Sequence, residues 1–423
     1  MNRLLPIPLV LLAASCGSGP DPSATGGDAE GVLVATANGG GGCCGYVSGV
    51  ALRHGHVFAA YGTMVAQVDF APSTVQPSSW QPQQAGSLLD VEIAAPAGDG
   101  TLWWTATDGG GSSCAVWTST EATFASPAAP AGTLCGGASA GTGMVSPGGG
   151  GPQAVVGLVA DTAALYAAIA TGNGGGTGGG SASGLSPDSQ QWPGSGPEVS
   201  ASGSIVRLDR TALSQPQALQ VTGGVRFDVG NSVHVLAQSS TNVYWLDATA
   251  VAPNLGRVMQ ASKASWTAGQ GQRLADVPSM AGQARALVGI AANDAYVAWA
   301  AAPMPGPGQS GCWVWAAGAD GTARRIYDGP QGPQQPMCHG LAVDAQFAYF
   351  AIVTVVSQTN DPQGNWLMGT GIGRVPLAGG PAQTVSLQSG RWYGPRRVLV
   401  DEQYVYAIDP SYVVRVPKSA FGG

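Results

Sequence analysis

The chain has 423 residues, of which 66 are glycine and 30 are proline, and only 10% are charged. So much Gly and Pro with so little Glu, Lys and Arg excludes a helical bundle or coiled coil, and a hydrophobic fraction of 44% with 12 Trp argues against disorder throughout. The net charge of −7 lacks the basic surface of a nucleic-acid binder, so no nucleic-acid partner is expected.

Residues 1–15 are predicted to be a secretory signal peptide. A short positive start precedes the apolar run 4–12, which is too short for a permanent membrane span. Small residues then lead to Cys16, an arrangement that resembles the bacterial lipoprotein signal. The resemblance implies cleavage before Cys16 and lipidation of its sulfur. Ordinary secretion is the alternative, because Ala13 and Ser15 also satisfy the small-x-small cleavage rule.

The next segment, residues 16–31, is predicted to be a flexible tether, because it consists of Gly, Pro, Ser and polar residues that bury no core. A lipid on such a tether anchors a protein to the membrane without spanning it. We therefore expect an exported, lipid-anchored protein of the bacterial cell envelope, with the outer membrane or the cell surface favoured, and a monomer.

Cysteine usage supports export. Removing Cys16 from the seven cysteines leaves six, and two short motifs, Cys114-Ala-Val-Trp and Cys312-Trp-Val-Trp, each have a partner 21 or 26 residues on, Cys135 and Cys338. Each pair is a plausible local disulfide in an oxidising compartment. The adjacent Cys43 and Cys44 are then left to each other, although six cysteines allow 15 connectivities. Buried free thiols are the alternative, and no Cys-x-x-Cys spacing indicates a metal site.

Residues 32–418 contain seven similar units. Each unit has three or four short β-rich runs separated by Gly, Pro and Asp, which is typical of consecutive antiparallel hairpins. The second run of each unit carries an aromatic residue after a small or aliphatic one. These aromatic residues are Phe58, Trp103, Tyr166, Tyr244, Tyr296, Tyr349 and Tyr406.

The repeat predicts an all-β fold: a seven-bladed β-propeller of four-stranded antiparallel blades. Sheets that stack face to face around an axis bury the aromatic residues between neighbours, and about 55 residues per unit is close to known propeller repeats. The last unit stops after its third run, so the orphan strand in residues 31–37 is expected to pair with residues 413–416 and to close the ring. A six- or eight-bladed propeller is the alternative. The Gly-rich segment 171–202 is expected to be a disordered insertion.

Two sequence motifs are similar to those of NHL and YWTD-like propellers. They are Tyr244-Trp245-Leu246-Asp247 and the run from Arg374 to Gly380. The resemblance covers most of residues 32–418 and implies a structural repeat, without an active-site signature. Propellers of this kind mostly bind other molecules, and some bacterial ones are enzymes.

The two faces of such a ring differ. The turns between the first and second runs are short, and Asp161, Asp344 and Asp401 stand in them five residues before the aromatic. We interpret these residues as turn-forming, with a ring of functional acids as the alternative. The long insertions 171–202, 301–311 and 354–370 are expected on the opposite face, together with the blade-to-blade segments 136–151, 261–283 and 388–395.

Four tryptophans in these long segments are candidate ligand-binding residues of the rim: Trp192, Trp266, Trp366 and Trp392. Aromatic rings there can stack on sugars or anchor a protein partner. The alternative is that they fold back to cover the loops' own small cores.

Support for catalysis is weak, and no catalytic residue, metal or cofactor is assigned. His54 and His56 could reach one ion, but no third ligand is near in sequence. The sequence 137–141 matches G-x-S-x-G without the strand-to-helix elbow that this motif needs. We therefore expect a non-catalytic scaffold that binds a protein or polysaccharide through its long-loop face. The alternatives are a hydrolase or lyase with acids converging at the central channel, and a purely structural envelope lipoprotein.

Overall fold

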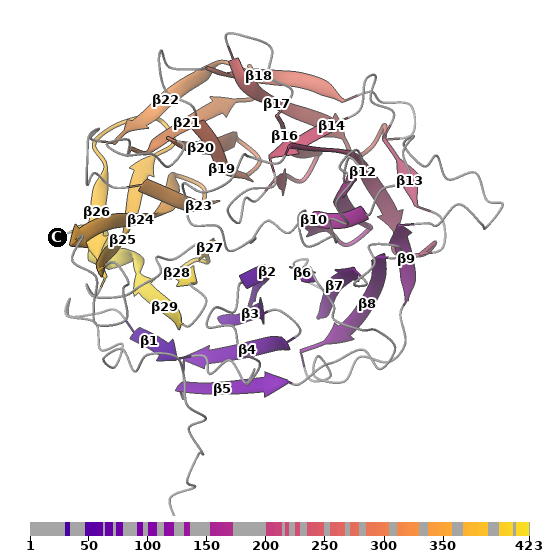
Figure 1. Cartoon of the computed structure of the whole chain (residues 1–423), viewed down its shortest axis with the longest axis horizontal. Coiled ribbons are helices and arrows are strands. Elements are labelled where there is room, and N and C mark those ends of the chain that lie inside the picture. Colours follow the sequence, from indigo (N-terminus) through magenta and orange to yellow (C-terminus); the bar gives the residue numbers. More distant parts are fainter. Residues whose placement is uncertain are drawn as a thin grey trace, which may run out of the picture.

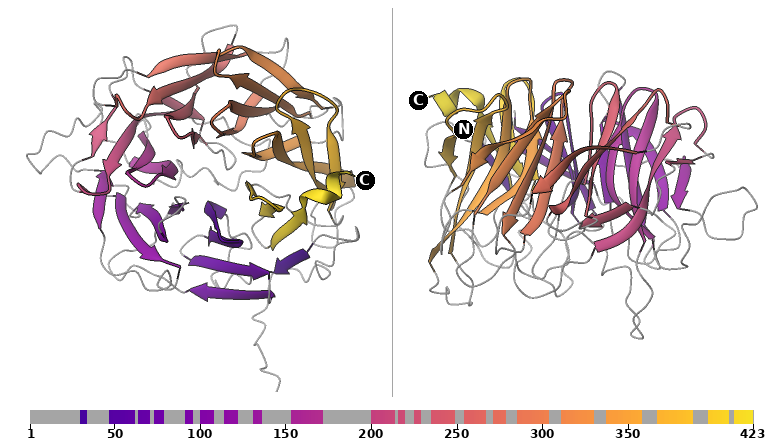
Figure 2. Two further views of the ribbon diagram at one scale, coloured as in Figure 1. Left: turned by 180° about the vertical axis from the view of Figure 1, so that it is seen from behind. Right: turned by 90° about the horizontal axis from the view of Figure 1, so that it is seen from above.

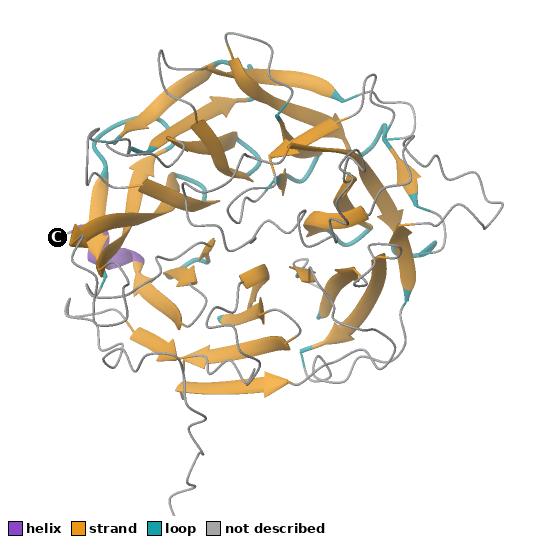
Figure 3. Ribbon diagram, in the orientation of Figure 1, coloured by secondary structure: helices purple, strands orange, loops and turns teal. Residues whose placement is uncertain are grey.

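The computed structural model describes most of the strands and the short turns. The described residues are 30–33, 47–61, 64–70, 73–78, 91–95, 100–107, 114–121, 131–135, 153–171, 200–213, 216–219, 225–228, 235–248, 254–266, 271–278, 285–303, 311–329, 337–357, 367–387, 397–408 and 412–422. They form seven antiparallel sheets arranged as blades around a central axis (Figures 1 and 3). The prediction of a seven-bladed β-propeller is confirmed.

The strands follow one another from the axis outward in each blade. Blade 1 contains β2 (Val47–Arg53), β3 (His56–Tyr61), β4 (Met64–Phe70) and β5 (Ser73–Ser78). Blade 2 contains β6 (Val91–Ala94), β7 (Thr101–Thr107), β8 (Cys114–Thr120) and β9 (Gly132–Cys135). Blade 3 contains β10 (Gln153–Ala160), β11 (Ala164–Thr171) and β12 (Ser200–Asp209), with β13 (Gln217–Ala218) and β14 (Val225–Asp228) both paired to β12.

The second half of the ring repeats this order. Blade 4 contains β15 (Leu236–Gln238), β16 (Asn242–Asp247), β17 (Asn254–Ser262) and β18 (Gln272–Pro278). Blade 5 contains β19 (Arg285–Ala292), β20 (Tyr296–Pro303), β21 (Trp313–Gly318) and β22 (Ala323–Asp328). Blade 6 contains β23 (Met337–Val343), β24 (Phe347–Ser357), β25 (Leu367–Pro376) and β26 (Gln383–Ser386).

Blade 7 closes the ring. It contains β27 (Arg397–Val400), β28 (Tyr404–Ile408), β29 (Tyr412–Pro417) and, as its outer strand, β1 (Glu30–Leu33). Gly31 lies opposite Val414 and Val32 opposite Val413, as the orphan strand predicted. The strand covers Glu30–Leu33, so it begins one residue before the predicted range 31–37. A short 3-10 helix, η2 (Lys418–Gly422), follows β29.

The core lies between the blades, because each sheet is apolar on both faces. Phe58 packs with Trp104 between blades 1 and 2, and Tyr349 packs with Val405 between blades 6 and 7. Six of the seven predicted aromatic residues are buried, and Tyr296 is partly exposed. Hiding these flat apolar faces requires a neighbour on each side, which is the physical reason for the closed circle.

Inner strands of adjacent blades approach closely where the first strand carries glycine. A Cβ added to Gly157 of β10 would lie 3.1 Å from the Cβ of Leu236 on β15. β-Bulges interrupt the register beside Gly157 and beside Gly289 of β19. Glycine at these positions therefore lets the inner strands pack without a side chain between them.

Alternating strand direction gives the two faces different connections. The turns that join the first to the second strand and the third to the fourth lie on one face, which we call the tight-turn face. The second-to-third and blade-to-blade connections, including 136–152, 172–199 and 388–396, leave from strand ends on the opposite face, the long-connection face; Figure 2 shows the strands running between the two. No helix among the described residues is long and apolar enough to cross a membrane.

Candidate functional site

The one predicted rim tryptophan that the structure describes is not on the rim. Trp266 follows β17 in the third-to-fourth connection of blade 4, so it lies on the tight-turn face, and the assignment of 261–283 as a blade-to-blade segment is wrong because β18 occupies its second half. Its ring is 2% exposed and packs 5.2 Å from Tyr166, and its Nε1 donates to the Gln217 carbonyl at 3.1 Å. It is therefore a core residue. Trp192, Trp366 and Trp392 lie outside the described residues.

A disulfide joins Cys312, just before β21, to Cys338 on β23, with a Cα–Cα distance of 5.1 Å. It was predicted as a local link, but it staples blade 5 to blade 6. Cys114 is also disulfide-bonded, and the strand register places its Cα opposite that of Cys135. Cys16, Cys43 and Cys44 lie outside the described residues, as does the signal segment.

The three predicted aspartates form turns. Oδ1 of Asp344 accepts hydrogen bonds from the amides of Gln346 and Phe347 at 2.9 and 2.8 Å. Asp161 and Asp401 do the same in their own blades, and Asn293 takes this position in blade 5. The turn interpretation is confirmed for these residues, because each carboxylate or amide oxygen is occupied by its own turn.

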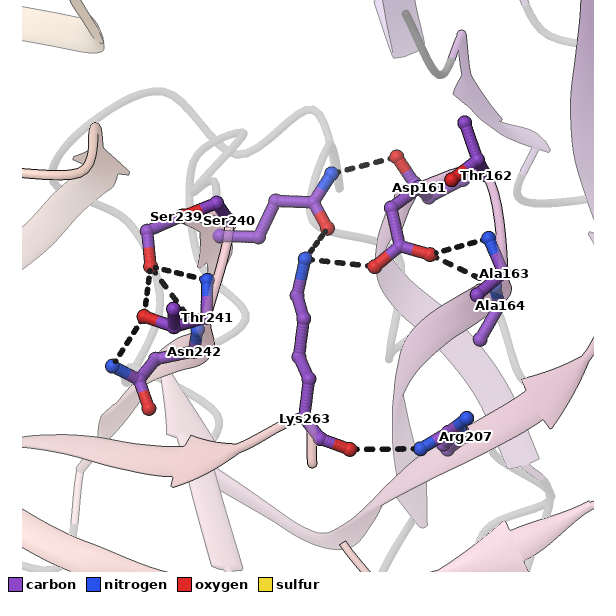
Figure 4. A network of polar contacts seen from close by, with 12 residues as sticks. Asp161, Thr162, Ala163, Ala164, Arg207, Ser239, Ser240, Thr241, Asn242 and Lys263 are labelled. Carbon is purple, nitrogen blue, oxygen red and sulfur yellow. Dashed lines mark hydrogen bonds and ion pairs between the residues drawn. The ribbon is translucent and has the colours of Figure 1, made fainter. Parts of the chain in front are cut away.

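In Asp344 and Asp161 the second carboxylate oxygen links one blade to the next. Asp344 Oδ2 accepts from Tyr349 Oη at 2.8 Å within blade 6 and from Lys418 Nζ at 2.6 Å, from the end of blade 7. Lys263 of blade 4 reaches Asp161 of blade 3 at 2.8 Å in the same way (Figure 4). These pairs form a belt of polar links around part of the tight-turn face.

The belt shifts the acid–base properties of its members. Burial by itself raises the pKa of the Asp344 carboxyl, but the hydrogen bonds from Lys418, from two turn amides and from Tyr349 together outweigh it and leave that pKa below its ordinary value. The pKa of the Asp161 carboxyl is lowered in the same way, with Lys263 as the hydrogen-bond donor in place of Lys418. Burial, then the bonded carboxylate of Asp344, raises the pKa of Tyr349 far above its ordinary value. At neutral pH the carboxyls of Asp344 and Asp161 are therefore ionised, and the Tyr349 hydroxyl keeps its proton.

A second set of links uses arginine. In three gaps an arginine of one blade donates to the carbonyl of the residue that directly follows the third strand of the next blade. We call them the interblade arginines. Arg207 donates to the Lys263 carbonyl at 2.8 Å, Arg324 to the Leu377 carbonyl at 2.8 Å, and Arg374 to the Lys418 carbonyl at 3.3 Å. Sequence reasoning missed them, because their role depends on which blade lies alongside.

The gap between blades 4 and 5 is different. A cavity of about 310 Å³ opens there on the tight-turn face, lined on the blade 4 side by polar side chains and on the blade 5 side mainly by small ones. The polar side chains are those of Thr241, Asn242, Tyr244, Gln260, Ser262, Ser265 and Gln272. The cavity is at the lower end of the size range of ligand sites.

The histidines of blade 1 do not form a metal site. His56 Nδ1 contacts Asp69 Oδ1, with Gln67 Nε2 3.2 Å from the same oxygen, while His54 Nδ1 lies 3.1 Å from Glu121 of blade 2. These are separate pairs. Among the residues that the structure describes, no three His, Cys, Asp or Glu side chains gather so that they could hold a metal ion.

The sequence matches no known family model, and no curated protein is similar to it. Solved structures do resemble the fold. Hydrazine synthase of Kuenenia stuttgartiensis aligns with a TM-score of 0.51 at 10% identity, over 92% of this chain and 99% of that one. The extracellular domain of a protein described as a hybrid two-component system from B. thetaiotaomicron aligns with a TM-score of 0.50 at 9% identity, over 92% of this chain and 39% of that one. At such identities the likeness shows the propeller fold alone.

Proposed function

We propose that the chain is an exported, lipid-anchored β-propeller that acts as a non-catalytic scaffold and binds a polysaccharide or protein of the cell envelope through its long-connection face. The observation that supports this proposal most is that the two faces of the ring carry different features. Polar links tie neighbouring blades together on the tight-turn face, whereas the longest connections all leave from the other. Variable connections on one rim of a rigid ring are where binding residues accumulate.

The anchor is supported by the N-terminal segment. Cys16 follows a short apolar run and precedes a tether that ends where β1 joins the outer edge of blade 7. A lipid on Cys16 would attach the ring to the membrane through the Gly- and Pro-rich segment 17–29.

Two measurements test the proposal. Expression of the full chain in a bacterium should yield a membrane-associated protein whose mature N-terminal peptide carries diacylglycerol on Cys16, and Cys16→Ala should release it into the soluble fraction. The purified soluble chain, applied to a glycan array and to envelope proteins, should bind through the long-connection face. Trp366→Ala with Trp392→Ala should weaken that binding, and Trp266→Phe is the matched control on the opposite face.

An unmodified, soluble wild-type chain would refute the anchor. Binding that is unchanged in the double tryptophan variant would refute the long-connection face as the site.

A further inference from the structure

Three blades carry an arginine on the third strand that reaches into the gap to the next blade, and blade 4 has a glutamine at the same register position. In blades 3, 6 and 7 the buried tyrosine of the second strand lies opposite an arginine of the third strand. The pairs are Tyr166 with Arg207, Tyr349 with Arg374 and Tyr406 with Arg415. In blade 4 the corresponding pair is Tyr244 with Gln260. Glutamine is two bonds shorter than arginine, and the cavity opens where it stands.

Blade 6 shows what the missing guanidinium would meet. Arg374 Nε donates to Gln383 Oε1 at 3.0 Å, Nη1 to the Lys418 carbonyl at 3.3 Å and Nη2 to the Phe421 carbonyl at 3.2 Å. The guanidinium carbon also lies 4.4 Å from the centre of the Phe347 ring. The place is therefore made of fixed oxygen acceptors, which match the planar fork of a guanidinium.

The same acceptor positions exist in the gap between blades 4 and 5. Gln272 lies opposite Gln260 on β18, as Gln383 lies opposite Arg374 on β26. Ala319 directly follows the third strand of blade 5, as Lys418 follows that of blade 7, and both Gln272 and Ala319 line the cavity. The side chains of Gln260 and Gln272 make no hydrogen bond with any other described residue.

The opposite wall leaves room for a ligand. On the blade 5 side the cavity is lined by small apolar residues together with the larger ring of Tyr296. The small residues are Ala295, Val297, Ala317 and Ala319. The two walls are tied at the turns, where the Ser240 amide of blade 4 donates to Asp294 Oδ1 of blade 5 at 2.7 Å. The gap is therefore held in shape at its edge by Asp294, beside the cavity.

Charge favours a cation. Asp294 is the one charged residue that lines the cavity among the described residues, and the Ser240 amide lowers the pKa of its carboxyl, so it is ionised at neutral pH. The ammonium of Lys263 in blade 4 is engaged by Asp161 and by Gln238 Oε1, at 2.8 and 3.0 Å. An incoming cation would find amide and hydroxyl oxygens along the row from Tyr244 to Gln272 and a carboxylate at the edge.

We propose that the cavity between blades 4 and 5 is a binding site for a guanidinium group supplied from outside the chain, as on an arginine side chain, which occupies the place that an interblade arginine fills in other gaps. The site lies on the tight-turn face, away from the face proposed for the scaffold function, so either proposal can fail without the other. A guanidinium is preferred over an ammonium, because several oxygen acceptors in a fixed arrangement use its five donors.

The test is calorimetric titration of the full chain with N-acetyl-L-arginine amide, and with N-acetyl-L-lysine amide and glucose as comparison probes. The arginine probe should bind, the lysine probe at least about tenfold more weakly, and glucose not measurably. Gln272→Ala should weaken arginine binding about tenfold or more, as expected for loss of a hydrogen bond to a charged group. Its matched control is Gln383→Ala, the same register position in blade 6, which should leave binding unchanged.

The decisive variant is Gln260→Arg, which places the chain's own guanidinium in the cavity. It should abolish binding of the arginine probe and raise Tm by roughly 2–4 °C, which separates occupation of the site from misfolding. Absence of binding to the wild-type chain, equal binding of the lysine probe, preferential binding of glucose, or full binding by Gln260→Arg would each overturn the proposal.

Discussion

The gap between blades 6 and 7 is filled by a side chain, whereas the gap between blades 4 and 5 contains a cavity, although the strands have equivalent positions in both. Arg374 crosses the first gap and meets three oxygen acceptors and two aromatic rings, those of Phe347 and Phe421. In the second gap Gln260 stands at the equivalent position and a cavity remains. The difference teaches that shortening one side chain at a repeated position can replace a structural contact with a cavity.

The gap between blades 5 and 6 carries the strongest single link, so its loss should have the largest effect. Cys338→Ser removes the disulfide to Cys312 and is expected to lower the free energy of unfolding by about 2–4 kcal/mol. Urea denaturation measures this change. Reduction of the wild-type chain also breaks the disulfide of Cys114, so it should give a loss at least as large. Equal midpoints for oxidised and reduced protein would show that the Cys312–Cys338 disulfide does not hold the two blades together.

Shortening the arginine in the gap between blades 6 and 7 should lower the free energy of unfolding somewhat less than loss of the disulfide does. Arg374→Gln reproduces the blade 4 arrangement and is expected to lower the free energy of unfolding by about 1.5–3 kcal/mol, because its charge-assisted hydrogen bonds are lost. The same denaturation series measures it. Arg273→Gln is the matched control, since Arg273 is mostly exposed and pairs with Asp276 three residues on. Exposed pairs of this kind contribute about 0–1 kcal/mol. Equal losses in the two variants would contradict the comparison.

The smallest expected change in stability concerns the belt of polar links, in which Asp344 pairs with Lys418. Asp344→Asn should lower the free energy of unfolding at pH 7 by about 1 kcal/mol, since the pair with Lys418 is only partly buried. The folded-state pKa of Asp344 is lowered, so this contribution is present above the unfolded pKa near 3.9 and is lost as the pH falls through the folded value.

Unfolding measured between pH 7 and pH 3 should therefore show the variant and the wild-type chain converging at acid pH. Lys418→Met should remove most of the difference at neutral pH. A gap between wild type and Asp344→Asn that widens as the pH falls would contradict the assignment.

Much of the fold was predictable, because its signals are local. Short β-rich runs, the buried aromatic of each second strand and the Asp turns recur along the chain, and the orphan N-terminal strand predicted how the ring closes. Trp266 shows where local reasoning ends. Its long connection suggested a blade-to-blade loop, but β18 within that segment places it on the tight-turn face and in the core.

The candidate site depended on register. In the printed sequence Gly256-Arg257-Val258 aligns naturally with Gly373-Arg374-Val375, which suggests that blade 4 has an interblade arginine like blade 6. In the structure Arg257 lies opposite Asp247, and Gln260 takes the position opposite Tyr244. Arg257 is three residues before the position opposite Tyr244, so its guanidinium does not take the place of an interblade arginine, and a cavity remains.

By itself the amino-acid sequence determined the number of blades, their aromatic cores and the closing strand, because alternating apolar residues and turn residues act over a few positions. Only the tertiary structure decided which carbonyl each arginine meets, which blades the Cys312–Cys338 disulfide joins and where a cavity stays open, because those contacts depend on the register within each blade and on the blade alongside.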